Sequence, residues 1–153
     1  MPSSTPAALR LQDYLPYRLS VAANAVSRLV AQAYERQFGL RNPQWRLLAV
    51  LADEGPLTQQ ALCRRTIMDK VTVMRAAQGL LRRRLVRRQP NDADGRSHRL
   101  VLTSAGSRLY RRIVPRALAY EAQLLAGVAS QEIVRFERML RRLERVASAG
   151  DKR

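Results

Sequence analysis

The first third of the chain carries one long apolar stripe. Apolar residues recur three or four positions apart from Leu15 to Phe38, and Gly39 follows as a stop signal. This spacing predicts an amphipathic helix of more than five turns. Pro16 falls in its first turn, where proline is tolerated. Residues 1–10, rich in Ser, Thr and Pro, offer little to bury, so we expect a disordered arm there.

Three shorter helices are predicted in the middle of the chain. Asn42 and Pro43 predict an N-cap and a first helical residue, and Gly55-Pro56 ends that helix. Its expected buried stripe is Trp45, Leu48, Ala49 and Leu51. After a strand residue at Leu57, Thr58 predicts the cap of a helix through Arg65, followed by a turn at Thr66.

The third of these helices has two distinct faces. Asp69 predicts its N-cap, and the helix is expected to run from Lys70 to about Arg84. Val73, Ala76, Ala77 and Leu80 form the expected inward stripe, and Lys70, Thr72, Arg75, Gln78 and Arg82 point outward.

The last part predicts a hairpin and two more helices. The alternating segments Leu85–Gln89 and His98–Leu102 flank the turn-rich residues 90–97. Thr103 predicts the cap of a helix to about Ala126 with a kink at Pro115, and Ser130 begins the final helix. Apolar residues of that final helix step by three and four, which is a heptad-like seam: Ile133, Phe136, Leu140, Leu143 and Ala147.

The order of elements favours one fold class. Two helices joined by a tight turn and followed by a two-stranded wing form a winged helix-turn-helix. We therefore expect a mainly α fold with a small β-hairpin wing. The flanking helices carry more apolar surface than this small module needs, so we expect them to pair with a second copy.

Charge points to a polyanionic partner. The 153 residues carry a net charge of +16, and a net +11 of it lies between Arg64 and Arg112. Only two of the 28 basic residues are Lys, a skew that a GC-rich coding sequence also produces, so the location of the charge matters more than its total. Double-stranded DNA is the partner that a basic helix-turn-helix predicts.

Other classes of function have little support in the sequence. One His, one Cys and no glycine-rich phosphate loop leave no nucleophile and base set, so we expect no enzyme, cofactor or metal site. No apolar run approaches the length of a membrane span, which favours a soluble, cytoplasmic protein without a membrane partner. A non-specific architectural nucleic-acid-binding protein stays an alternative.

Two groups of residues are candidates for reading DNA. On the predicted recognition helix, Arg75 and Gln78 suit guanine and adenine edges, while Lys70 and Thr72 suit phosphates or bases. In the wing, Arg96 is placed to enter the minor groove, and Asp94 could hold its guanidinium.

These segments together resemble the multiple-antibiotic-resistance regulator (MarR) family of bacterial transcription factors. The resemblance rests on residues 69–75, 85–88, 94–97 and 100–106 with Leu80 and Arg83, and upstream on Gln44-Trp45, Leu48, Leu51 and residues 57–60. It implies one domain over residues 11–153, with a winged helix-turn-helix at about 43–106 and dimerisation helices at 11–39 and 107–148. Arg84 departs from the pattern, because the family usually has glycine there to close the recognition helix.

The resemblance also implies a dimeric repressor or activator. For this chain we expect a ligand-responsive repressor that binds a pseudo-palindromic operator as a homodimer. Many members respond to small phenolic or aromatic carboxylate effectors, for which Tyr17, Arg18, Arg28 and Trp45 are the candidates here. Trp45 as a core residue, and the two arginines as surface charges, are the alternatives. Cys63 allows a second alternative, a redox-sensing regulator, although a small buried residue fits its place inside a helix better.

Overall fold

The computed structural model describes residues 9–150, in two compact units that meet between Ile113 and Val114. Residues 1–8 of the expected N-terminal arm lie outside the described part of the chain. The first unit holds α1 (Leu15–Phe38), α2 (Asn42–Glu54), α3 (Gln59–Thr66), α4 (Lys70–Arg82), a three-stranded sheet and the start of α5 (Ser104–Leu124). The second unit holds the rest of α5 and α6 (Ser130–Gly150). A short 3-10 helix, Leu11–Asp13, precedes α1.

Helix α1 has the predicted start and stop. It begins at Leu15, and Gly39 after its last residue has a φ of 61°, the left-handed conformation that glycine adopts without a steric penalty. Only Tyr34 of this helix is buried. Much of its apolar stripe, including Leu15, Val21 and Leu29, is exposed in the single chain.

The cap of α2 differs from the prediction by one residue. Arg41, not Asn42, is the N-cap, and its backbone N–H donates to Oε1 of Gln44 at 2.9 Å. Leu48 and Leu51 are buried as predicted, Trp45 and Ala49 are half-buried, and Leu47 is a core residue that the predicted stripe missed.

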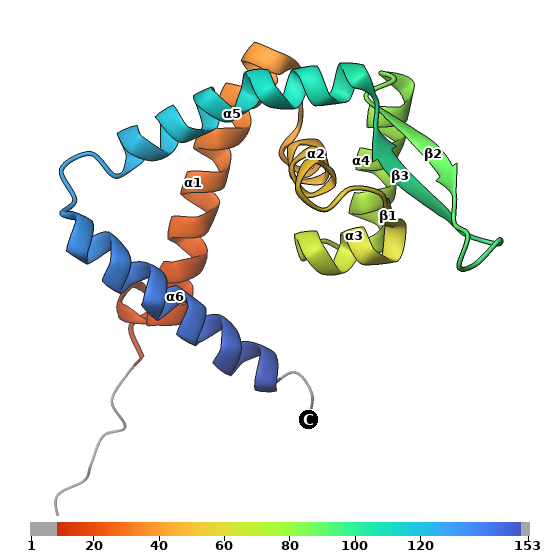
Figure 1. The fold of residues 1–153 in the computed structure, drawn as a ribbon. Helices are drawn as coiled ribbons and strands as arrows, with labels where there is room; N and C mark the ends of the chain where they lie inside the picture. The colour runs from red at the N-terminus through yellow and green to blue at the C-terminus, as the bar shows by residue number, and fades with distance from the viewer. Residues whose placement is uncertain (1–8, 151–153) are drawn as a thin grey trace, which may run out of the picture. The chain divides into compact units, whose positions relative to one another are not determined.

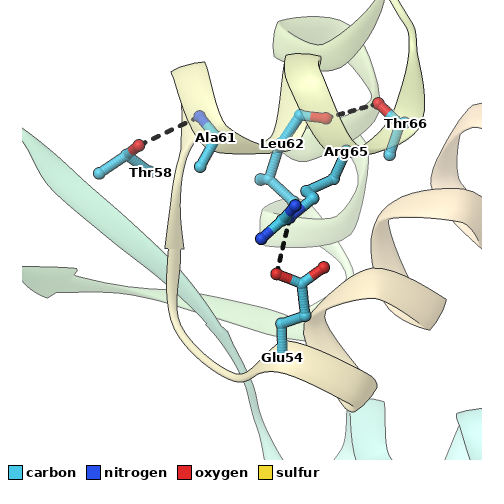
Figure 2. A network of polar contacts seen from close by, with 6 residues as sticks. All are labelled: Glu54, Thr58, Ala61, Leu62, Arg65 and Thr66. Atoms are coloured by element: carbon cyan, nitrogen blue, oxygen red, sulfur yellow. Dashed lines mark hydrogen bonds and ion pairs between the residues drawn. The ribbon is translucent and has the colours of Figure 1, made fainter.

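Polar contacts fix α3 against the end of α2 (Figure 2). The Arg65 guanidinium donates to the Glu54 carboxylate at 2.7 Å, and the Thr58 hydroxyl accepts from the Ala61 N–H at 3.2 Å as the predicted N-cap. Thr66 is not in a turn but is the last residue of α3, where its buried hydroxyl donates to the Leu62 carbonyl at 2.6 Å. The turn falls at Ile67 instead, whose φ is 52°.

The wing is part of a three-stranded antiparallel sheet. Strands β2 (Val86–Pro90) and β3 (His98–Leu102) form the predicted hairpin, whose loop projects away from α2 (Figure 1). The short β1 (Leu57–Thr58) pairs with the other edge of β3, which gives the strand order β1-β3-β2. Pairing of Leu57 with Leu100 therefore ties the start of α3 to the base of the wing.

The core of the first unit lies among α2, α3, α4 and the sheet. Its fully buried side chains include Leu47, Leu48, Leu62, Val73 and Leu80. In the second unit, by contrast, no side chain among residues 114–149 is buried. Helix α5 continues past Pro115, and apolar residues of α6 such as Phe136 and Met139 are each 56% exposed.

Candidate DNA-binding surface

Helix α4 has the two faces that its sequence predicts. Val73, Ala76, Ala77 and Leu80 are buried, whereas Lys70, Arg75, Gln78 and Arg82 are exposed. The helix ends at Arg82, two residues before the predicted end. Arg84, at the position where a glycine was expected from the family pattern, adopts a φ of 54° and so takes the left-handed conformation itself.

The start of α4 is held by a side-chain cap. Asp69 accepts hydrogen bonds from the Thr72 backbone N–H at 2.8 Å and from the Thr72 hydroxyl at 2.6 Å. These bonds, the one from the hydroxyl foremost, hold the pKa of Asp69 below its ordinary value. Thr72 is half-buried and uses its hydroxyl hydrogen in this cap, so within the free chain it positions the helix start.

Grooves lie on both sides of α4. One, of about 580 Å³, separates the helix from the wing and is lined by Met74, Gln78, Arg88 and Arg96, among others. The other, of about 700 Å³, lies toward the end of α1 and the start of α2 and is lined by residues that include Arg41, Arg75 and Arg82. The outer face of α4 is therefore a cationic ridge, which is the shape that enters a major groove.

The tip of the wing is braced from inside. The Asn91 side-chain amide donates to the Ser97 hydroxyl at 2.7 Å, and Asn91 is 7% exposed. Asp94 does not form an ion pair with the Arg96 guanidinium within the described residues; its carboxylate accepts the Arg96 backbone N–H at 3.1 Å. The expected role of Asp94 is therefore corrected: it shapes the turn, and the exposed Arg96 side chain extends from it.

Arg83 makes a contact that the sequence did not reveal. Its guanidinium donates to the carbonyl oxygens of Gly39 at 2.8 Å and Phe38 at 3.0 Å. Free carbonyls at the end of a helix attract cations, so this bond pair joins the end of α4 to the end of α1. The sequence offered only a basic residue near the end of a predicted helix as a clue.

The four candidate effector residues are distributed along α1 and α2. Tyr17, Arg18 and Arg28 are exposed on α1, and about 16 Å of helix separates Tyr17 from Arg28. Trp45 is half-buried, with its ring 5.1 Å from that of Tyr34 and stacked at 5.8 Å on that of Tyr110. None of the four lines either groove beside α4.

Cys63, which supports the redox alternative, is half-buried on α3. The single histidine, His98, is exposed at the start of β3. No helix within residues 9–150 is both long and apolar enough to cross a membrane.

Comparison with known proteins agrees with this geometry. A model of the MarR family matches residues 38–97, which span α2, α3, α4 and most of the wing. A solved structure of a probable transcriptional regulator from Pseudomonas aeruginosa is 30% identical, with a TM-score of 0.80, and covers 88% of this chain and 99% of its own. The chain belongs to the MarR family of transcription regulators.

Two further relatives extend the comparison. The HTH-type transcriptional repressor NicR of Pseudomonas putida is 27% identical, over 93% of this chain and 91% of its own. The PcaV transcriptional regulator of Streptomyces coelicolor, solved in complex with its natural ligand, is 26% identical with a TM-score of 0.78, over 92% of this chain and 99% of its own. This MarR protein is therefore a DNA-binding transcription regulator.

Proposed function

We propose that this MarR protein is a ligand-responsive repressor that binds a pseudo-palindromic operator as a homodimer. The observation that carries the proposal is the capped start of α4, which exposes Lys70, Arg75 and Gln78 on one cationic ridge between two grooves. In a dimer, two such helices would enter successive major grooves about 34 Å apart. The similarity to the repressor NicR supports repression rather than activation.

The test of major-groove reading is Arg75→Ala. A bidentate contact of Arg75 with a guanine edge predicts a loss of about 1–3 kcal/mol on the specific duplex and little change on random DNA. Arg141→Ala is the matched control, because it removes the same charge from α6, outside the helix-turn-helix. Equal losses on specific and random duplexes would instead assign Arg75 to the phosphate backbone.

The wing is proposed to read the minor groove. A narrow A·T-rich minor groove has the most negative potential, and the exposed Arg96 side chain suits it. Arg96→Ala should weaken binding most where the flanks are A·T-rich. Insensitivity to the flanks would contradict insertion of Arg96.

A small phenolic or aromatic carboxylate is the proposed effector. The PcaV relative has a natural ligand, and in the present chain the Trp45 ring beside Tyr34 of α1 offers an aromatic wall. Arg28 and Arg18 precede Tyr34 on α1 by six and sixteen residues. A ligand changes operator affinity only if it binds the DNA-competent and incompetent states differently, a coupling of typically about 1–3 kcal/mol.

The proposed effector class is tested with a panel of aromatic acids. Thermal shift measures their binding to the protein, and release of the operator measures their effect on DNA binding. Substitution of Arg18, Arg28 or Trp45 should blunt the response and leave operator binding in place. If no acid binds, or if binding leaves operator affinity unchanged, the effector part of the proposal fails and the DNA-binding part stands.

A non-specific architectural protein is the alternative function. It would bind any duplex with equal affinity. Competition between random DNA and the duplex that the protein selects from a random library therefore distinguishes this alternative from a sequence-specific repressor. A redox-sensing regulator that uses Cys63, a half-buried thiol on α3, is the second alternative.

A further inference from the structure

The first two turns of α4 expose two apolar side chains. Val71 is 50% exposed and Met74 is 40% exposed, whereas Val73 between them is fully buried. Neither Val71 nor Met74 belongs to the core stripe of the helix. Both side chains are therefore available to a binding partner.

These two side chains lie among the proposed DNA-reading residues. Val71 precedes Arg75 by four positions and Gln78 by seven, so the three share one face of α4. Met74 precedes Gln78 by four positions and lines the groove between α4 and the wing. An apolar strip therefore runs beside the polar readers along the same ridge.

The charged residues around Val71 and Met74 favour a polyanion as the binding partner of this surface. Lys70, Arg75 and Arg82 are exposed on the same helix. Asp69, the one carboxylate between residues 64 and 91, is bonded to Thr72 in the helix cap. Asp94 lines the groove on the wing side, but Arg88 and Arg96 line the same groove, so the border of the strip is net cationic and complements DNA phosphates.

In a major groove, only one kind of chemical group matches these two apolar side chains. Valine has no hydrogen-bonding group, and the methionine thioether is only a weak acceptor. Neither can read the donor and acceptor pattern of the base edges, but the C5-methyl group of thymine is an apolar feature of that groove. We infer that Val71 and Met74 recognise thymine methyl groups in the operator, an inference that rests on the proposed entry of α4 into the major groove.

The test removes single methyl groups from DNA. The full-length protein is first used to select its preferred duplex from a random library, and each thymine of the half-site is then replaced by deoxyuridine. This change removes the C5-methyl group and keeps every base-pairing atom. At one or two positions per half-site we expect about a fourfold loss of affinity, the factor for losing the burial of one such group.

Variants of the strip connect the effect to the two side chains. Val71→Ala and Met74→Ala should weaken binding to the thymine duplex and should no longer distinguish it from the deoxyuridine duplex. Gln78→Ala is the matched control, because it shortens a polar neighbour on the same face and should keep the deoxyuridine penalty. Circular dichroism verifies that each variant is folded.

The outcomes separate this inference from the proposed function. If a specific duplex is selected but no deoxyuridine substitution matters, methyl recognition is wrong and sequence-specific binding stands. If Val71→Ala and Met74→Ala keep the deoxyuridine penalty of the unmodified protein, the two side chains do not carry the recognition. If no sequence is enriched, the proposed function itself fails.

Discussion

Ile67 has a backbone conformation that β-branched residues rarely adopt. Its φ of 52° lies in the left-handed region, and its side chain is 87% exposed, so no buried contact offsets the strain. Ile67→Gly should raise the free energy of unfolding by about 1 kcal/mol, the relieved strain minus the greater freedom of glycine in the unfolded chain. Urea denaturation measures the change. Ile67→Ala keeps a Cβ in the left-handed conformation, so its free energy of unfolding should rise less than that of Ile67→Gly. An equal rise in the two variants would show that backbone strain is not the cause.

Asp69 makes the stability of the α4 cap depend on pH. The Thr72 hydroxyl and backbone N–H lower the pKa of Asp69, so its stabilising effect is present above the ordinary aspartate pKa and is lost as the pH falls through the lowered value. Asp69→Asn keeps a cap acceptor without a titrating group. We expect the difference in Tm between the two proteins to be largest near neutral pH and to disappear in acid. A difference that is constant with pH would contradict the assignment.

At the scale of elements, local signals could be predicted and distant contacts could not. The bounds of α1 follow from periodicity, Pro16 and Gly39, all within the segment itself. The outward face of α4 follows from the same periodicity. The bond of Arg83 to the Gly39 carbonyl joins residues 44 apart, and no spacing rule reaches that far.

The ends of two elements were misplaced for a physical reason. Apolar–polar alternation predicts β2, and the Asp69 cap predicts α4, each to within one or two residues. The backbone conformation of the residues between α4 and β2 depends instead on tertiary packing. Arg84 takes a left-handed conformation where the Thr103 hydroxyl donates to its carbonyl oxygen at 2.7 Å. That contact crosses from the end of β3 to the end of α4, so the short-range sequence pattern holds no trace of it.

Gly106 makes possible the close approach of α5 to the start of β2. A Cβ at this position would collide with the Leu85 backbone carbonyl oxygen, which no side-chain rotation can move. Gly106→Ala should therefore lower the free energy of unfolding by about 1–3 kcal/mol. Gly95→Ala in the wing loop is the control, since its Cβ would meet nothing within 4 Å. If the two variants unfold at the same urea concentration, the collision is relieved elsewhere.

For the whole molecule, the unburied apolar residues of the flanking helices predict dimerisation. Phe136 and Met139 of α6 are each 56% exposed, and Leu29 of α1 is 54% exposed. Charges at buried interface positions are costly, so a protein that carries both Phe136→Glu and Met139→Glu should be monomeric. Sedimentation at micromolar concentration measures the assembly state.

Operator affinity should fall with the loss of the dimer, because one recognition helix per chain reads only a half-site. Arg141→Ala controls for a surface change on the same helix. A monomeric unmodified protein, or a double variant that stays dimeric, would contradict the assignment of α6 to the interface.

Trp45 is the only tryptophan of the chain, and its ring stacks on Tyr110 of α5 beside Tyr34 of α1. The indole fluorescence of this protein therefore originates at one known point, beside aromatic side chains of two other helices. Emission excited selectively from indole is an optical signal that needs no attached dye. An effector that enters between these helices would change the emission intensity or wavelength, whereas substitutions confined to the wing loop would not. Effector binding can thus be measured by Trp45 emission, and its effect on operator affinity can be measured in a separate DNA-binding assay, both on the unmodified chain.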